Sequence, residues 1–365
     1  MKKILFGITG LTLGGAERVL VDIANKLVDY YDITIFTLYG EGELEASLDN
    51  RIKRKTVYSK KWQEISKYEK IKIRLQLLFF KNKLYNKYLK ENYDIIIAFL
   101  EGPVTRLFAT KSRKTKKIAW VHNDISQVFG KGFGAKLKKL IDKFCYKKYD
   151  KIIFVSNDNY EKFIKTYKIS TPKQIIYNYI DKENVIKKAN EKIQINFANN
   201  KINLISVSRL VRQKGIDRWI RVHSKLKKEG SNHIVYIIGE GPLKEELIKQ
   251  IHEENVQDSF FLLGKMDNPY PYIKHADYFC LFSYFEGYGM VLEEAKILDK
   301  PILITNTAAR EAVTNYESSF IFDNTEEGLE SGLRKIVNKK ENNTKYVYEN
   351  KDRLKQVINL LEELS

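Results

Sequence analysis

The sequence predicts an α/β protein built from two doubly wound domains, each with a mostly parallel sheet and helices on both faces. The chain has 365 residues, more than twice the roughly 150 residues of an ordinary domain. Short apolar runs typical of buried parallel strands alternate with helical patterns along most of its length. The alternation stops in a polar, Asn- and Lys-rich stretch within about Ser170–Asn200 and then begins again.

The apolar runs form two series, one on each side of this polar stretch. Helical patterns between them complete the βα alternation of two Rossmann-like halves with a cleft between them. We expect a first domain over residues 1–180, a second over 195–345, and a C-terminal helix over 346–365 that packs back on the first. The expected strands are Ile4–Ile8, Ile33–Leu38, Ile95–Leu100, Ile118–Val121, Ile152–Val155, Asn203–Val207, Ile234–Ile238, Phe260–Leu263, Phe279–Phe282 and Ile302–Ile304.

Cysteine usage and the first residues indicate a reducing compartment. Cys145 and Cys280 are far apart in the chain, and Gly7 and Gly10 interrupt the first apolar run, which favours a strand over a secretory leader. No apolar stretch approaches the ~20 residues of a membrane-spanning helix. We expect a cytoplasmic protein, soluble or peripheral on the inner face of the plasma membrane.

The net charge of +18 is concentrated in one segment. Residues 51–90 contain fourteen Lys and Arg against Glu64 and Glu69, an excess of twelve positive charges in forty residues. Such a field attracts nucleic acid or anionic lipid, and a solvated face is the alternative. No zinc spacing or nucleic-acid-binding signature accompanies the charge, so we do not expect a nucleic-acid partner.

Glycines follow the first expected strand, between Gly7 and Glu17, where a helix opens. They can bring backbone N–H groups close to a phosphate at the positive helix end. Their spacing does not fit the dinucleotide fingerprint G-x-G-x-x-G. An equally good interpretation is that they serve only the tight turn.

Two cations, Arg209 and Lys214, follow the first strand of the second series. They leave the carboxyl end of that strand, where ligands bind in open α/β sheets. An Arg fork and a Lys five residues later can clamp a diphosphate. Loop cations are more often solvated, so the pair alone does not define a site.

The most informative segment runs from Phe282 to Ala295, where a strand ends and a helix begins. Glu286 falls on the loop before the helix and Glu294 about two turns into it. The free N–H groups near Tyr288–Val291 predict an anion site, and carboxylates beside it can accept hydrogen bonds from sugar hydroxyls. Taken singly, Glu286 could compensate the helix dipole, and Glu294 could be solvated beside Glu293.

Together these segments resemble glycosyltransferase family 4, a retaining family of GT-B fold, in which two Rossmann-like doubly wound domains face a central cleft. The resemblance covers nearly the whole chain. Its carriers are Gly14-Gly15-Ala16-Glu17-Arg18, Ser208-Arg209-Leu210 with Lys214-Gly215, Gly239-Glu240-Gly241-Pro242-Leu243, and the Glu-x(7)-Glu motif from Glu286 to Glu294 with Pro301 after it. Asp299 and Ser319 depart from the family pattern, and both lie off the phosphate site.

The resemblance implies a nucleotide-sugar donor, with UDP the family-frequency choice, bound as a substrate without a cofactor or a metal. Arg209 and Lys214 would neutralise the diphosphate, which the backbone of Gly287, Tyr288, Gly289, Met290 and Val291 would cradle. Glu286 would hold the transferred sugar and Glu294 the ribose, while Met266 would meet the base. Gly15 is also assigned to the donor.

In the first domain, the same resemblance places His122 beside the donor sugar, as a second catalytic residue with Glu286. Gly14 and Glu101 are assigned to the acceptor side. A lone His is more often structural, and the carriers in this domain are fewer. The implied activity is transfer of a sugar to a lipid-linked saccharide in surface polysaccharide, teichoic acid or glycan assembly. The alternative is a non-catalytic GT-B partner subunit of a glycosyltransferase complex.

The same resemblance implies a function for the basic segment, because family members that act on polyprenyl-diphosphate-linked sugars carry a similar basic helix. An anionic membrane surface is the expected partner. A core-packed helix with a basic outer face is the alternative. One side of the expected helix carries Ile71, Leu75, Leu78, Tyr85 and Leu89, broadened by Leu77, Phe80, Leu84 and Tyr88.

Overall fold

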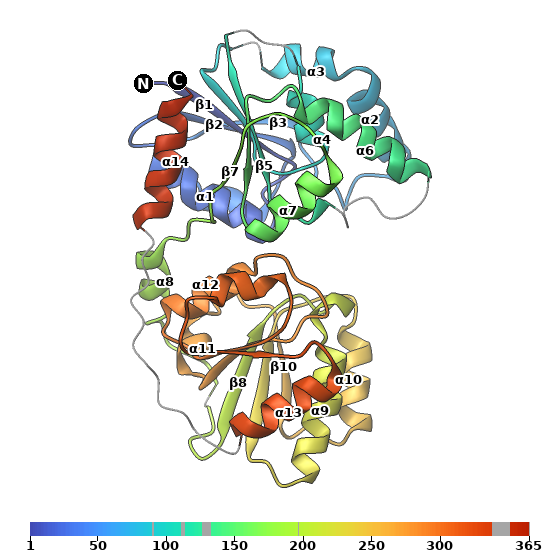
Figure 1. Ribbon diagram of the computed structural model, residues 1–365, viewed down its shortest axis with the longest axis vertical. Helices are drawn as coiled ribbons and strands as arrows, with labels where there is room; N and C mark the ends of the chain where they lie inside the picture. Colours follow the sequence, from blue (N-terminus) through green and yellow to red (C-terminus); the bar gives the residue numbers. More distant parts are fainter. Residues whose placement is uncertain (90, 111–113, 126–132, 196, 338–350, 365) are drawn as a thin grey trace. The chain divides into compact units, whose positions relative to one another are not determined.

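The computed structural model describes residues 1–364 except 90, 111–113, 126–132, 196 and 338–350. The chain divides into two compact units (Figure 1). The first contains Met1–Ile180 together with Asn350–Ser365, and the second contains Asp181–Glu349. Each unit is a parallel sheet with helices, which confirms the predicted α/β class.

The first unit has a seven-stranded sheet in the order β3-β2-β1-β4-β5-β6-β7, and every pairing in it is parallel. This is the doubly wound order, with its switch point between β1 and β4. Edge strands β3 and β7 were not predicted, because β3 is charged and half exposed and β7 has three residues. The strands are β1 Lys3–Ile8, β2 Asp32–Tyr39, β3 Lys53–Tyr58, β4 Ile95–Ala98, β5 Lys116–Val121, β6 Lys151–Phe154 and β7 Lys173–Ile175.

Helices cover both faces of this sheet. Figure 1 shows α1 and α14 on one side and α2, α3, α4 and α6 on the other. Helix α14 buries Val357, Leu360 and Leu361, and Glu363 pairs with Lys151 at 2.8 Å. The helical elements are α1 Gly15–Leu27, η1 Glu43–Ser47, α2 Lys67–Phe79, α3 Lys81–Tyr88, α4 Pro103–Phe108, α6 Phe133–Tyr146, α7 Asn157–Thr166 and α14 Lys351–Glu363.

The basic segment forms two helices, because Phe80 has a non-helical backbone (φ −118°, ψ 24°) that ends α2 and precedes α3. The expectation of one apolar side is therefore wrong. Residues after the break face the core: Leu89 is buried, and Leu84, Tyr85 and Tyr88 pack against the core with Leu77. Ile71, Leu75 and Phe80 are exposed instead. The side chain of Leu78 and the whole of Lys90 lie outside the described residues.

The second unit has a six-stranded parallel sheet in the order β10-β9-β8-β11-β12-β13. The order is again doubly wound, and the switch point lies between β8 and β11. The strands are β8 Ile202–Val207, β9 His233–Ile238, β10 Phe260–Gly264, β11 Tyr278–Leu281, β12 Ile302–Thr305 and β13 Ser319–Phe322. The helical elements are α8 Lys182–Lys188, η2 Arg212–Lys214, α9 Ile216–Lys228, α10 Lys244–Glu253, α11 Tyr270–His275, α12 Met290–Ile297, η3 Ala308–Val313 and α13 Glu326–Val337.

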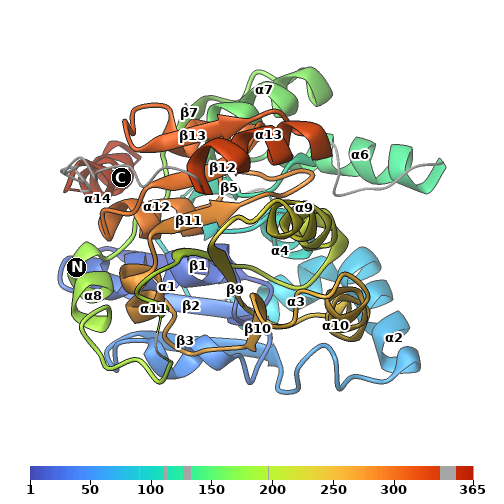
Figure 2. The ribbon, with the colours of Figure 1, turned by 90° about the horizontal axis from the view of Figure 1, so that it is seen from below.

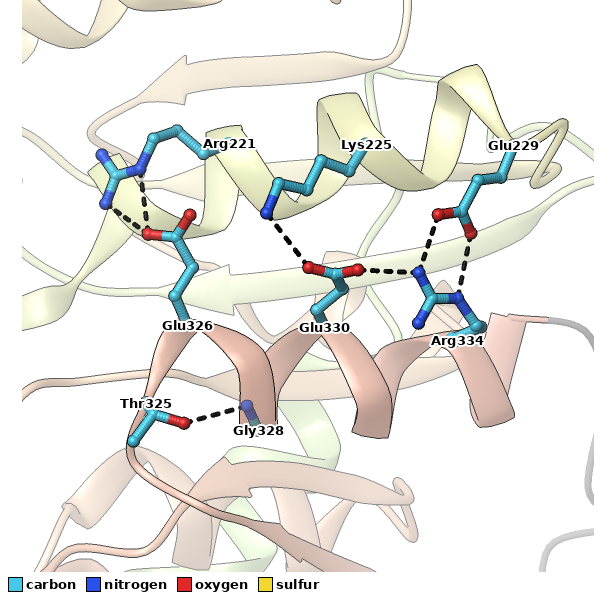
Figure 3. A network of polar contacts seen from close by, with 8 residues as sticks. All are labelled: Arg221, Lys225, Glu229, Thr325, Glu326, Gly328, Glu330 and Arg334. Atoms are coloured by element: carbon cyan, nitrogen blue, oxygen red, sulfur yellow. Dashed lines mark hydrogen bonds and ion pairs between the residues drawn. The ribbon is translucent and has the colours of Figure 1, made fainter.

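A ladder of ion pairs joins α9 to α13 along one side of this sheet (Figure 3). Each rung links residues 105 positions apart, and the rungs follow one another every four residues. The regular spacing fixes the register of two helices that run in the same direction. The rungs are Arg221–Glu326 at 2.8 Å, Lys225–Glu330 at 3.2 Å and Glu229–Arg334 at 2.7 Å.

Candidate functional site

The donor-site candidates lie on loops at the carboxyl edge of the second sheet. Arg209 and Lys214 follow β8, Met266 follows β10, and Glu286 follows β11. Strands β8 and β11 are hydrogen-bonded neighbours, so their loops leave the sheet side by side at the switch point. Ligands of open α/β sheets bind at this position.

Gly215 brings these two loops together. Its φ of +63° suits glycine, and a Cβ built on it would lie only 2.4 Å from the carbonyl oxygen of Phe282. The backbone amide of Tyr284 also donates to the carbonyl oxygen of Gln213 at 2.8 Å. Any larger residue at position 215 would separate the loop of Lys214 from the loop of Glu286.

Lys214 and Glu286 form an ion pair. Lys214 Nζ lies 2.5 Å from Glu286 Oε2, and the two side chains are only 15% and 12% exposed. Ser283 Oγ donates to the same oxygen at 3.0 Å. Glu286 Oε1 accepts no hydrogen bond from a described residue. The pair therefore orients Glu286 through one oxygen and leaves the other for a ligand hydroxyl.

Arg209 differs from Lys214 in its surroundings. It is exposed and forms no ion pair with a residue that the structure describes. The structure thus offers one exposed cation and one cation shared with a carboxylate. A diphosphate that contacts Lys214 must share its ammonium group with Glu286.

The phosphate-cradle candidates form the turn that leads into α12. Gly289 has a φ of +70° and caps the helix, which begins at Met290. A Cβ on Gly287 would meet no atom within 4 Å, so the backbone there faces open space. Val291 follows in the first turn of the helix, where N–H groups have no intrahelical acceptor. The arrangement can bind an anion at the positive helix end.

Glu294 is not a solvated surface residue. It is buried and accepts a hydrogen bond from Tyr270 Oη at 3.0 Å. The neighbouring Glu293 is fully buried, contacts Tyr288 Oη and pairs with Lys296 at 3.0 Å. The interpretation of Glu294 as a surface residue beside Glu293 is therefore wrong.

Arg218, which was not predicted from the sequence, is buried and donates hydrogen bonds to the backbone of the loop that carries Glu286. Its Nη2 donates to the carbonyl oxygens of Phe282 at 2.8 Å and Ser283 at 3.1 Å, and to Asn324 Oδ1 at 2.7 Å. Asn324 in turn donates to the carbonyl oxygen of Tyr284 at 2.8 Å. Burial lowers the pKa of the Arg218 guanidinium. No local pattern marks Arg218, because its partners come from distant loops.

Glycines after β9 also serve close backbone contacts. A Cβ on Gly239 would lie 1.9 Å from the carbonyl oxygen of Ser208, and one on Gly241 would lie 2.3 Å from that of Leu210. These glycines let the β8 and β9 loops pack together, which accounts for part of the family pattern. Met266 lies half-buried on the loop after β10.

The first-unit candidates also gather at a carboxyl edge, that of β1, β4 and β5. Gly14 caps α1, and Gly15 is the first residue of that helix. A Cβ on Gly14 would lie 2.1 Å from Glu17 Oε2, the far end of a flexible side chain that can move aside. Glu101 follows β4, and His122 follows β5.

Glu101 and His122 are in direct contact. Glu101 Oε2 accepts from the backbone amide of His122 at 3.0 Å, and Oε1 contacts the amide of Asn123. The His122 ring lies 4.7 Å from the ring of Phe99, and its Nε2 is buried without a partner among the described residues. Burial lowers the pKa of His122 to about 3, so the imidazole is neutral near pH 7. A neutral, unpartnered Nε2 can form a hydrogen bond with a ligand.

Two negative observations concern only the described part of the chain. It contains no group of three or more His, Cys, Asp or Glu side chains that could hold a metal ion. It contains no helix that is both long and apolar enough to cross a membrane.

Comparison with known proteins identifies the class. The model for Glycosyltransferase Family 4 matches residues 13–184, and the model for Glycosyl transferases group 1 matches residues 187–353. The Campylobacter jejuni N-acetylgalactosamine-N,N'-diacetylbacillosaminyl-diphospho-undecaprenol 4-alpha-N-acetylgalactosaminyltransferase is 30% identical over 266 residues, covering 72% of this chain and 68% of that protein. A second C. jejuni alpha-1,4-N-acetyl-D-galactosaminyltransferase, named for an undecaprenol-linked substrate, is 26% identical over 301 residues, covering 81% and 77%.

Solved structures agree on the fold. Anabaena Alr3699/HepE in complex with UDP and glucose has a TM-score of 0.73 at 17% sequence identity, covering 99% of this chain and 100% of that one. The fold and these matches define a glycosyltransferase of the GT-B type. Within that class, the chain belongs to glycosyltransferase family 4.

Proposed function

We propose that this glycosyltransferase moves a sugar from a UDP-sugar to a lipid-linked saccharide, with retention at the anomeric carbon, during assembly of a cell-envelope glycan. The observation that carries the proposal is the oriented carboxylate of Glu286, paired with Lys214 beside the first turn of α12. The names of the two C. jejuni relatives specify undecaprenol-linked acceptors. The Anabaena neighbour binds UDP.

The donor diphosphate would bind at the carboxyl edge of the second sheet. Arg209, Lys214 and the N–H groups at the start of α12 would stabilise the negative charge that develops on the leaving diphosphate. Glu286 Oε1 would accept a hydrogen bond from the transferred sugar, and Glu294 would hold the ribose. These groups can supply the required positive potential from the protein itself, so we expect transfer to proceed without a metal.

Retention would follow from attack by the acceptor hydroxyl on the face from which the diphosphate leaves. His122 would contribute a hydrogen bond through its neutral Nε2, not a positive charge. Glu101 would shape the acceptor side by holding the backbone after His122. Gly14 and Gly15 would let the start of α1 approach the substrates.

The acceptor implies a membrane surface, and the basic segment supports one. Residues 51–90 comprise β3, α2 and α3, and α2 exposes Ile71 and Leu75 among its cations. We infer a peripheral enzyme on the inner face of the plasma membrane. Anionic headgroups would attract this segment.

A panel of nucleotide sugars incubated with a polyprenyl-diphosphate-linked saccharide tests the function. We expect transfer from one or a few UDP-sugars, an α-linked product from an α-linked donor, and full activity in excess EDTA. An inverted product would contradict retention. Loss of activity in EDTA, restored by magnesium or manganese, would contradict metal-independence. The absence of transfer from every donor would favour the non-catalytic partner.

A further inference from the structure

Helix α6 presents large apolar side chains on its outer face. Leu137, Leu140 and Phe144 are 51%, 50% and 57% exposed. Spacings of three and four residues place them in one stripe along the helix. We call these three residues the α6 stripe. Contiguous exposed apolar side chains on a surface helix mark an interaction site.

The inner face of α6 fixes the direction of the stripe. Asp142, Cys145 and Tyr146 are buried. Asp142 also forms a bidentate pair with Arg106 of α4, with Nε–Oδ1 at 2.5 Å and Nη2–Oδ2 at 3.0 Å. At 3.6 residues per turn, these buried positions lie on the side of the helix opposite the stripe. The stripe therefore points away from the core and cannot turn inward without breaking the Arg106 pair.

Lysines surround the α6 stripe. None of them forms an ion pair with a described residue, and the only acidic residue of the helix, Asp142, is engaged by Arg106. Lys147 Nζ lies 5.8 Å from the centroid of the Phe144 ring. The surrounding lysines are Lys136, Lys138, Lys139 and Lys143 on the helix and Lys147 and Lys148 after it.

Helix α2 repeats this arrangement on the same side of the first sheet (Figure 1). Tyr68, Ile71 and Leu75 are exposed, again at spacings of three and four, while Ile73 is buried. Figure 2 shows α2 and α6 toward opposite ends of that helix layer. Two separated helices thus carry an outward apolar stripe among lysines, which suits an extended, negatively charged, apolar partner better than a small one.

We propose that the α6 stripe is a membrane-insertion surface that enters the headgroup–acyl boundary of an anionic bilayer while its lysines contact lipid phosphates. This pattern of apolar stripe and flanking cations is that of helices lying in the membrane interface. The proposal rests on the lipid-linked acceptor of the proposed function, because insertion would hold the enzyme where that acceptor is embedded. It adds a hydrophobic contact to the electrostatic one of residues 51–90.

A fluorescent probe on the stripe tests insertion in the full chain. Leu140→Cys would be labelled with an environment-sensitive NBD group, since Cys145 and Cys280 are both buried. Vesicles of phosphatidylcholine with phosphatidylglycerol should shift the emission to the blue and raise it several-fold. The same probe at Ile321→Cys, on the second unit, should not respond. A probe at position 140 that stays in a water-like environment while the protein co-sediments overturns the proposal. So does a blue shift that grows with protein concentration alone, which would indicate self-association.

A polar variant gives a second, independent measurement. Replacing Leu137, Leu140 and Phe144 with Gln should weaken vesicle binding at least tenfold, whereas Ile186→Gln with Ile321→Gln should not. All five positions are exposed, so folding should be unaffected. Transfer to a water-soluble acceptor should be unchanged in both variants. Insertion without any transfer would count against the proposed function alone, and transfer without insertion would count against this surface alone.

Discussion

Glu286 depends on Lys214 and Ser283 for its orientation, because both contact the same carboxylate oxygen. Its side chain is mostly enclosed, with one oxygen oriented by the protein and the other free to accept a hydrogen bond from a ligand. An oriented acceptor of this kind strengthens a hydrogen bond to a reacting sugar without reorganisation during the reaction.

Replacing Glu286 with Ala should abolish most transfer and leave the fold intact. The change removes a hydrogen bond to the reacting sugar, and one charged hydrogen bond of about 1.5–3 kcal/mol corresponds to tenfold or more in kcat/KM. Glu286→Gln, which keeps the shape but loses the Lys214 ion pair, should also be impaired. Initial rates and thermal melts of both variants check this. Turnover within twofold of the parent would refute the assignment.

Arg209→Ala and Lys214→Ala should differ in their effect on stability. Arg209 is exposed and unpaired among the described residues, so its loss should weaken UDP binding alone. Loss of Lys214 should weaken UDP binding and also destabilise the unit by about 1–3 kcal/mol, less than for a fully buried pair, because Glu286 loses its partner. Calorimetry with UDP and urea unfolding separate the two quantities. Unchanged UDP affinity in both variants contradicts the diphosphate clamp.

Arg218→Met should impair activity through the Glu286 loop. The variant leaves the carbonyl oxygen of Phe282 without its donor, at a cost of about 1–3 kcal/mol for a buried group, whereas the Ser283 carbonyl keeps the hydrogen bond from Thr305 Oγ1 at 2.9 Å. A positioning role predicts that kcat falls more than UDP affinity. Lys225→Met, which lies on the same helix away from the loop and breaks the ion pair with Glu330, is the matched control. If both variants lose the same stability and the Arg218 variant keeps its kcat, Arg218 has only a structural role.

At the scale of elements, local pattern predicted the central strands and the edge strand β10, and it missed the edge strands β3, β7 and β13. Runs such as Ile95–Leu100 are buried on both faces and read as strands, whereas β3 carries Lys53, Arg54 and Lys55 because an edge strand is half solvated. The break at Phe80 was also missed, since both halves of the segment have helical spacing. Only packing against the sheet selects which apolar residues turn inward.

The same contrast between local pattern and long-range packing holds for the candidate site. Arg209, Lys214 and Glu286 follow strands in the sequence, and the resemblance to glycosyltransferase family 4 then assigned these three residues and Glu294 to the donor. The Lys214–Glu286 pair and the contacts of Arg218 were not predicted, because they join residues 72 and 64–106 positions apart. Contacts of that range follow from strand order, which one sequence does not specify.

A buried histidine pair should make the second unit sensitive to acid. His223 Nδ1 lies 2.8 Å from His233 Nε2, and both side chains are fully buried. Burial lowers the pKa of His233 to about 4 and that of His223 to about 2. The unfolded chain, with a His pKa near 6.5, therefore binds protons that the folded chain does not.

Stability should accordingly be full above about pH 6.5 and fall as the pH drops toward 4, by up to about 1.4 kcal/mol per pH unit for each histidine. Urea unfolding between pH 7.5 and 4.5 measures the slope. His223→Asn should flatten it, whereas His252→Asn, at an exposed position, should not. A slope that is the same in all three proteins would exclude the pair as the cause.

At the scale of the whole molecule, the proposed donor contacts lie mostly in the second unit. The proposed acceptor contacts and the exposed cationic helices lie in the first. Charge is divided as well, since the segment 51–90 carries an excess of twelve positive charges. A lipid-linked acceptor would thus be met by the unit that also carries this cationic segment.

Replacing Lys72, Arg74, Lys81 and Lys83 with Glu should release the protein from anionic vesicles. Each Lys or Arg near an anionic surface contributes about 1 kcal/mol, so reversing four of them removes most of a reversible attachment. Binding by the parent should weaken with added salt, because exposed charges are screened beyond about 8–10 Å near physiological ionic strength. The matched control reverses Lys187, Lys192, Lys228 and Lys335 of the second unit, which changes the net charge equally.

Co-sedimentation should fall in the first variant only, and transfer to a lipid-linked acceptor should fall with it while transfer to a water-soluble acceptor persists. Equal loss in both variants would show that net charge acts without regard to position, and sedimentation like the parent would make this segment a solvated face.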